Sequence, residues 1–400
     1  MVSFESQIEK LNAKLIDATG CAEGHIQTVY SPLRISPLGA HVDHQDGLVT
    51  GMTLDRAILL SFIPRTDRYV RVQSVNFPGT VEFDLDNVPP KRLRDWGNYV
   101  RGAVLALKQH HHLHFGMDAV VQGRMPIGGL SSSAAVGVAY LLALETANEL
   151  EISVEENIQL DRHIENVYLG LMNGILDQSI ILMSDWTHLT YLDCQSVEFE
   201  KYRTAAHPDQ FEILVVYSGL AQALTGTDYN KRVSECQQAA RLLLEWAGEP
   251  VPDTPRLRMV SDEAFATFGA RLPSPLDRRA RHFLTELERV RMGVIAWQNG
   301  DLEEMGRLIN ESGASSIHKY ECGCPHLITL YNILSQCQGV YGARFSGGGF
   351  RGSCISLINP AYRHEIQAAI DAQYPLAHPD IAGSYSIHFC RPDGPARLWR

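Results

Sequence analysis

The stretch Pro126-Ile-Gly-Gly-Leu-Ser-Ser-Ser-Ala-Ala135 decides how this chain folds. Two glycines and three consecutive serines lead directly into residues 134–144, an apolar run that is typical of a buried helix. Glycine lets the backbone approach a ligand closely, and a helix N-terminus carries about half a unit of positive charge. The stretch therefore predicts a loop that wraps an anion such as a phosphate group. A flexible turn that only caps a buried helix is the alternative.

The overall composition excludes several classes of protein. The 400 residues are 45% apolar and 20% charged, with a net charge of −11 and a pI near 5.8. No run of Lys and Arg suggests nucleic-acid binding, and no apolar run approaches the about 18 residues of a membrane span. Residues 1–17 are typical of a polar amphipathic helix, not of a secretory signal. We therefore expect a cytoplasmic protein with no nucleic-acid or membrane partner, and its oligomeric state stays open.

Strand-like and helix-like segments alternate along the chain. Their order predicts an α+β fold with antiparallel sheets, divided near residue 200 into domains 1–200 and 201–400. We expect strands at 27–36, 50–62, 70–74, 81–85, 118–124, 187–192, 198–201, 211–217, 340–346, 353–358 and 384–390. We expect helices at 98–111, 134–149, 154–168, 173–183, 227–247, 277–299, 325–337 and 360–373.

Two further segments concentrate polar side chains. Ser31–Gly47 places an arginine, two histidines and two aspartates among glycine and proline. Such a density is costly in a core and indicates a hydroxyl-rich ligand held by charged groups. In Glu165–Gln178, the carboxylates of Glu165 and Asp177 stand in apolar surroundings, where such groups are usually paired, metal-bound or catalytic. The alternatives are a polar connection between strands and an acidic helix cap at Asp177.

A glycine-rich segment lies nearer the C-terminus. Residues 342–352 contain five glycines between two strand-like stretches. Glycine at this density allows the backbone to approach a ligand closely. A glycine-rich hairpin would have the same composition and is the alternative.

Taken in order, these segments resemble the motifs of the GHMP kinase superfamily, and its galactokinase branch most. The motifs of that branch are similar to Arg34–His44, Gly128–Ala135 and Gly342–Gly352. Its catalytic GIMDQ segment is similar to Gly174–Gln178, with Leu in place of Met, and its tyrosine segment to Asp228–Cys236. The resemblance spans about residues 30 to 355, and the Gly-x4-Gly-Lys-Ser/Thr sequence of P-loop enzymes is absent from the chain.

The resemblance implies a fold and a reaction. The N-terminal domain would carry a left-handed βαβ-type phosphate loop of the kind known from a ribosomal protein. The C-terminal domain would be a ferredoxin-like α/β sandwich. The activity implied is the ATP-dependent phosphorylation of the anomeric C1 hydroxyl of a sugar, with Mg²⁺ as cofactor.

The resemblance also implies a role for individual residues. Asp177 would accept or orient the C1 proton, and Arg34 would neutralise charge on the transferring phosphoryl group. Glu165 would hold Mg²⁺ together with Ser133, for which Ser132 is the competing choice. The ATP phosphates would be cradled by Gly128, Gly129, Leu130, Ser131, Ser132, Ser133 and Ala134. The sugar would be contacted by His41, Asp43, His44, Tyr229 and Gly348.

Two departures from the galactokinase pattern concern specificity. The branch has Gly-Glu-His-Thr-Asp-Tyr where this chain has Gly39-Ala-His-Val-Asp-His44, so Ala40 replaces the glutamate expected to bind the C6 hydroxyl. At about 4 Å and a dielectric of about 20, that glutamate would repel a C6 carboxylate by roughly 4 kcal/mol, about a thousandfold in affinity. Arg351 stands where the branch has glycine and is a candidate carboxylate ligand, with His44 assisting. The alternatives are that Arg351 faces solvent or a phosphate group.

These residues, together with Asn166–Ser179, resemble the plant-type galacturonokinases. That resemblance implies D-galacturonic acid as substrate, with galacturonate 1-phosphate and ADP as products. Galactose and L-arabinose, which lacks C6, are alternative substrates. A non-catalytic sugar sensor on the same fold is a further alternative, against which the presence of Arg34, Glu165 and Asp177 argues.

Overall fold

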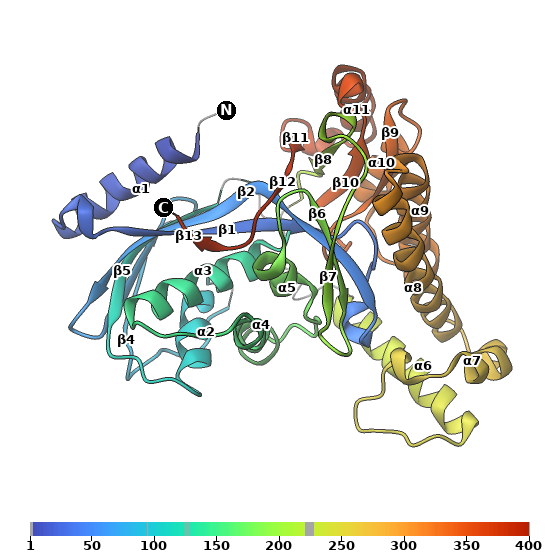
Figure 1. Cartoon of the computed structure of the whole chain (residues 1–400), viewed down its shortest axis with the longest axis horizontal. Helices are drawn as coiled ribbons and strands as arrows, with labels where there is room; N and C mark the ends of the chain where they lie inside the picture. The colour runs from blue at the N-terminus through green and yellow to red at the C-terminus, as the bar shows by residue number, and fades with distance from the viewer. Residues whose placement is uncertain (1–2, 94, 124, 126–127, 221–227, 400) are drawn as a thin grey trace.

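The computed structural model describes residues 3–93, 95–123, 125, 128–220 and 228–399. Within them, two sheets and their covering helices form an α+β fold, as the sequence predicts (Figure 1). Pro126 and Ile127, which open the deciding stretch, lie outside the described residues.

The first sheet is built around one long strand. Among the described residues it has nine strands in the order β13-β1-β2-β5-β3-β4, with β12 and β6 also on β2, and β7 on β6. Their bounds are β1 Gln27–Ile35, β2 Leu48–Arg65, β3 Tyr69–Ser74, β4 Thr80–Asp84, β5 Gly116–Gly123, β6 His188–Asp193, β7 Phe199–Arg203, β12 Pro392–Asp393 and β13 Arg397–Leu398. All pairs are antiparallel except β3 with β5.

Helices cover both faces of this sheet (Figure 1). Helix α1 (Phe4–Thr19) places Ile8, Leu11 and Leu15 at helical spacing against Tyr30 of β1 and other residues of the outer face. Helix α3 (Ser132–Ala147) is apolar on nearly all sides and is buried on the opposite face. Helices α2 (Asn98–Leu107), α4 (Val154–His163) and α5 (Leu176–Met183) pack around α3. Residues 128–134 therefore lead into a helix that is buried against the first sheet and three other helices.

The second sheet has the order β11-β8-β10-β9 and is antiparallel throughout. Its strands are β8 Glu212–Tyr217, β9 Val340–Phe345, β10 Ser353–Ile358 and β11 Ser386–Cys390. The helices that accompany it are α6 Tyr229–Ala247, α7 Asp262–Phe268, α8 Leu276–Asn299, α9 Leu302–Ser315, α10 Pro325–Leu334 and α11 Arg363–Ala377. Helix α9 packs on β9, and α8 reaches from α9 to the first sheet, so that α8 connects the two halves.

Short turns of helix complete the described chain. Two are π-helical, η3 (Ile164–Leu169) and η7 (Ser316–Tyr320). The others are η1 Glu23–His25, η2 Asp43–Gln45, η4 Pro208–Gln210, η5 Leu257–Met259, η6 Gly269–Arg271, η8 Pro360–Tyr362 and η9 Pro379–Ile381. Both π-helices directly continue an α-helix, and η3 carries a residue of the predicted site, Glu165.

The C-terminal end of the chain returns to the first sheet. Strand β12 pairs with β2 and β13 with β1, and the ring of Trp399 lies 5.6 Å from that of Tyr30. A division at residue 200 assigns this end to the C-terminal domain, but in the structure it completes the N-terminal sheet. The boundary near residue 200 stays a prediction for the remainder of the chain. None of the described helices is long and apolar enough to cross a membrane.

Candidate active site

The glycine/serine loop ends in a helix start that no side chain caps among the described residues. Ser131 is in the left-handed conformation, with φ 53°, and α3 begins at Ser132. The Ser131 side chain makes no capping hydrogen bond, and its buried Oγ has no partner in the described part of the chain. The first amides of α3 and this hydroxyl are therefore available to an anion.

A second glycine loop presses against the first. Gly129 has φ 82°, and a Cβ there would come within 3.0 Å of the Ser346 carbonyl oxygen. The Ser353 hydroxyl donates to the Gly128 carbonyl at 3.0 Å. Only glycine fits at positions 128 and 129, where the backbone lies directly against residues 346–353.

An arginine and an aspartate meet beside these two loops. Arg34 of β1 donates from Nε at 2.8 Å and from Nη2 at 2.5 Å, both to Oδ1 of Asp177 in the first turn of α5. Arg34 is buried, and its Nη1 has no hydrogen-bond partner among the described residues. Because a buried guanidinium donor without a partner is costly, this atom is available to an incoming anionic group.

Glu165 lies next to this pair, on the π-helix η3. Its Oε2 accepts from the Asn173 side chain and the Ser133 hydroxyl bonds to its carboxyl, whereas Oε1 has no partner in the described chain. Burial, and then the charge of Asp177, raise the pKa of Glu165 to about 7, although the Ser133 and Asn173 bonds act to lower it. The π-helical turn places this carboxyl at the start of α3, and such turns are frequent at functional sites.

The predicted sugar segment forms the opposite wall. Asp43 accepts from the Gly174 amide at 3.1 Å, and burial, with the charge of Asp177, raises its pKa to about 6. His41 stacks on Tyr320 with ring centroids 4.4 Å apart, and burial holds its pKa well below the ordinary value. Tyr229, at the start of α6, is buried and lines the same pocket. His41 is therefore a neutral ring, while Asp43 is an acceptor in its ionised form.

The structure brings most predicted side chains together in one pocket. Its wall contains nine of the predicted residues: Arg34, Ala40, His41, Asp43, Ser133, Glu165, Asp177, Tyr229 and Gly348. Seven further residues line it: Ser36, Gly39, Leu171, Asn173, Leu176, Arg344 and Gly347. Of the competing magnesium ligands, Ser133 lines the pocket and Ser132 does not. Asn173 and Arg344 lie inside segments 165–178 and 342–352, but no role for either was expected from the sequence.

Two predicted sugar ligands lie elsewhere. His44 is buried with both ring nitrogens engaged, Nε2 with the Tyr320 hydroxyl at 3.0 Å and Nδ1 with the Gln45 amide at 3.0 Å, so it supports Tyr320. Arg351 is exposed beyond the glycine run, because the bends after Gly349 turn this residue outward. The structure places Arg351 outside the pocket wall, and the expectation that it meets a substrate carboxylate stays a prediction.

The other predicted loop residues contribute backbone and packing. Leu130 is buried, and its carbonyl accepts from the Arg34 amide at 3.3 Å, which ties the loop to β1. Ala134, in the first turn of α3, is fully buried. Gly128, Gly129, Ser131 and Ser132 do not line the sugar-side pocket. Their placement at the α3 N-terminus is what a phosphate cradle requires.

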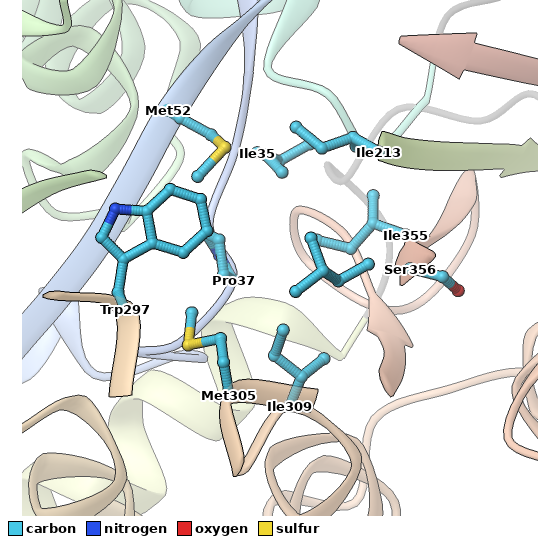
Figure 2. A pocket seen from close by; sticks show the side chains of 10 residues that line it. Ile35, Pro37, Met52, Ile213, Trp297, Met305, Ile309, Ile355 and Ser356 are labelled. Carbon is cyan, nitrogen blue, oxygen red and sulfur yellow. The ribbon is translucent and has the colours of Figure 1, made fainter. Parts of the chain in front are cut away.

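A second pocket, where the two sheets pack together, differs in character (Figure 2). In this view Trp297, Met52 and Met305 lie on one side of it and Ile213 and Ile355 on the other. Ser356 is the only serine, and no charged side chain is among the described residues that line it. A wall of this kind has no charged donors for phosphate or sugar groups. The polar pocket around Asp177 is therefore the candidate active site.

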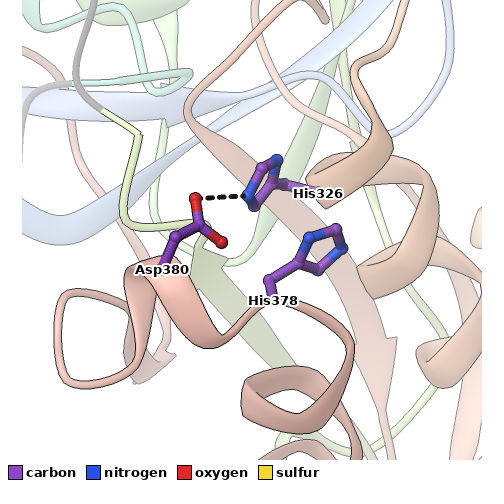
Figure 3. Close-up of side chains that lie close together, drawn as sticks. All are labelled: His326, His378 and Asp380. Atoms are coloured by element: carbon purple, nitrogen blue, oxygen red, sulfur yellow. Dashed lines mark ion pairs between the residues drawn. The ribbon is translucent and has the colours of Figure 1, made fainter.

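A cluster of His326, His378 and Asp380 lies at the other end of the second half (Figure 3). The two rings stack with centroids 3.9 Å apart, and His378 Nε2 bonds to the Thr329 hydroxyl at 2.9 Å. Imidazole binds a metal in its ring plane, and nearly parallel rings direct their lone pairs side by side instead of at one ion. The arrangement is a stacked pair with an ion pair of 3.6 Å to Asp380.

An anion cradle at a helix start, two buried acids and an arginine around one polar pocket define a kinase-type phosphotransferase. Two family models match, GHMP kinases N terminal domain over residues 98–185 and GHMP kinases C terminal over residues 293–376. The galacturonokinase of Arabidopsis thaliana is 42% identical, with 98% of each chain covered. The chain belongs to the GHMP kinase family.

Further relatives agree with this assignment. The galactokinase of Roseiflexus sp. (strain RS-1) is 35% identical, with 92% of each chain covered. The crystal structure of Lactococcus lactis galactokinase complexed with galactose superposes with a TM-score of 0.88 at 28% identity, covering 98% of this chain and 99% of that one. The two-domain GHMP kinase fold predicted from the sequence is confirmed, and membership of a kinase family implies the use of ATP.

Proposed function

We propose that this chain phosphorylates the C1 hydroxyl of D-galacturonic acid with ATP, giving galacturonate 1-phosphate and ADP. One observation carries the substrate assignment: Ala40 lies in the wall of the same pocket as the Arg34–Asp177 pair. A glutamate at this position, as in the galactokinase pattern, would repel a C6 carboxylate, whereas alanine does not. The galacturonokinase relative, identical at 42% of positions, supports the same substrate.

The chemistry needs few groups. The C1 oxygen attacks the γ-phosphorus of ATP, the bond from that phosphorus to the β,γ-bridging oxygen breaks, and ADP leaves with that oxygen. The hydroxyl proton passes to the Asp177 carboxylate. Arg34, whose Nη1 is buried without a partner among the described residues, neutralises charge on the transferring group.

Ser133 and Glu165 fit a magnesium ion. They supply a hydroxyl and a carboxylate, the oxygen ligands that this cation prefers, and Glu165 Oε1 is buried without a partner in the described chain. When bound, Mg²⁺ would neutralise the charge of the ATP phosphates. The loop from Gly128 to Ala134 would hold those phosphates at the start of α3.

The remaining wall would hold the sugar. Asp43 and Tyr229 bring a carboxylate and a phenol to the hydroxyl-binding side, and His41 adds a neutral ring nitrogen. Gly348 contributes to the same wall with its backbone alone.

Steady-state ADP release from the purified protein with MgATP tests the proposal. We expect kcat/KM for galacturonate to exceed that for galactose, glucuronate and L-arabinose at least tenfold, with the product phosphorylated at C1 by NMR. Equal use of galactose, which the galactokinase relatives favour as the second candidate, would overturn the uronate assignment and leave a sugar 1-kinase. Absence of turnover with all four sugars would favour a non-catalytic sensor.

A further inference from the structure

Arg344 of β9 is a buried cation without a carboxylate partner in the described part of the chain. It is 3% exposed, and among the described residues its guanidinium donates only to backbone carbonyls. Nε donates to the Phe345 carbonyl at 3.0 Å, and Nη1 to that of Ser36 at 2.8 Å. Removing a guanidinium from water without an anionic partner is costly, so an arginine in this state is suited to an anionic ligand.

Two other buried arginines, unlike Arg344, have carboxylate partners. Arg279, 1% exposed, pairs with Glu235 and Glu321, both at 2.7 Å. Arg289 pairs with Glu286 at 2.8 Å. Each of these two arginines therefore has a carboxylate within ion-pair distance. Arg344 has no such carboxylate among the described residues.

Glu286 is the acid whose charge raises the pKa of Arg344 most, but its carboxylate oxygens already accept hydrogen bonds from other groups. Oε1 of Glu286 accepts from the amides of Gly39 and Ala40, both at 2.9 Å, and from the Ser312 hydroxyl at 2.6 Å. Its Oε2 accepts from Arg289. Burial lowers the pKa of Arg344 to about 10, and the charge of Glu286 offsets this only in part. Glu286 thus fixes the backbone behind Ala40 and does not neutralise Arg344 directly.

The position of Arg344 matches the gap left at residue 40. Arg344 and Ala40 line the same pocket, and Nη1 is bonded to Ser36, four residues before Ala40. Nη2 makes no hydrogen bond to any described residue. We propose that Arg344 binds the C6 carboxylate of galacturonate in the space that Ala40 leaves open, and that it is a specificity-determining residue. This inference rests on the proposed substrate.

A pair of substrates and a matched control test it. Arg344→Met removes the cation at similar volume, Arg344→Lys keeps a point charge, and Arg351→Gln removes an exposed arginine from the same glycine-rich segment. We expect Arg344→Met to raise KM for galacturonate about 50-fold and KM for galactose less than threefold. Arg344→Lys should fall between it and the wild type, because ammonium cannot make the paired contact. Arg351→Gln tests the other candidate ligand, and if Arg344 binds the carboxylate this variant should keep the wild-type KM for both sugars.

Different results separate the two proposals. If wild type uses galacturonate but Arg344→Met raises KM for both sugars equally, Arg344 only anchors Ser36, and the inference is overturned while the function stands. If KM for galacturonate rises in Arg351→Gln and in no other variant, Arg351 and not Arg344 binds the carboxylate, and the inference is overturned. Failure of the wild type to use galacturonate would overturn both. If Arg344→Met does not fold, calorimetric binding of each sugar to Arg344→Lys decides, with a selective loss for galacturonate expected and an equal loss contradicting it.

Discussion

The two ends of the pocket treat a buried arginine in opposite ways. At the transfer end, Arg34 is paired with Asp177 at 2.5 Å, next to Glu165 and Ser133. At the specificity end, beside Ala40, Arg344 meets only carbonyl oxygens within the described chain. The transfer end is neutralised before substrate arrives, whereas the specificity end gains its counter-charge only with an anionic substrate. Catalysis and selectivity should therefore respond to different substitutions.

The largest effect is expected at the transfer end. Asp177→Asn keeps the shape of the side chain but removes the proton acceptor and the partner of Arg34, so kcat should fall about 1,000-fold for every sugar. Nucleotide binding, measured by fluorescence titration, should stay within about threefold. Asp185→Asn, just beyond the same helix, is the control and should keep full activity. A kcat near wild type in Asp177→Asn would exclude this residue from the reaction.

A smaller and selective effect is expected at the specificity end. Ala40→Glu places a carboxylate beside the sugar's sixth carbon and supplies Arg344 with an internal partner, so kcat/KM for galacturonate should fall about 100- to 1,000-fold. The value for galactose should change less than fivefold, which competition assays with the two sugars can measure directly. Ala40→Ser adds volume without charge and is the matched control. Equal losses for both sugars would show that residue 40 acts through size.

Local pattern predicts the strands and the motif residues well. The expected strand at 353–358 matches β10 to the residue, because apolar and β-branched residues fill it between a glycine run and Pro360. Helix α9 lies where the sequence analysis predicts none. Its signals are local nevertheless, since Asp301 caps the Glu304 amide, and Leu302, Met305 and Leu308 recur at helical spacing. The sequence pattern for this helix was therefore present, although no helix was expected there.

The site residues divide by the range of the contacts that define them. Local sequence is enough to predict Arg34, Glu165 and Asp177, because each is a charged residue inside a short recognisable motif. Arg344 bonds to Ser36, 308 residues away in sequence, and no local pattern reports such a pairing. Arg351 stands in the same glycine-rich segment, but only the bends after the glycines reveal that it faces solvent.

The buried acid behind the specificity end should contribute to stability. Burial alone would raise the pKa of Glu286, but the charges of Arg289, His282 and Arg344 outweigh it and lower the pKa to about 2. An acid with a lowered folded pKa stabilises the fold above its unfolded pKa, and loses this contribution as pH falls through the folded value. Glu286→Gln should therefore reduce the free energy of unfolding by about 3 kcal/mol at pH 7.

Urea unfolding of wild type and Glu286→Gln at pH 7, 5 and 3 measures this contribution. The difference between the two proteins should fall to less than half at pH 3, because the unfolded acid then takes up its proton. Glu303→Gln, at an exposed acid of α9, is the control and should show a small difference at each pH. If the difference in unfolding free energy between wild type and Glu286→Gln does not change with pH, the effect comes from packing and not from charge.

A second buried acid, near the transfer end, should have the opposite and smallest effect. Both carboxyl oxygens of Asp161 are buried without a partner in the described chain, and burial, with the charges of Glu165 and Asp177, raises its pKa well above the ordinary value. A raised folded pKa imposes a cost that appears as pH rises above the unfolded value. Asp161→Asn should therefore increase the free energy of unfolding by about 1 kcal/mol at pH 7 and by nothing at pH 3. A loss of stability at pH 7 would mean that the Asp161 carboxylate is bound by a group of the transfer end, and would weaken the contrast between the two acids.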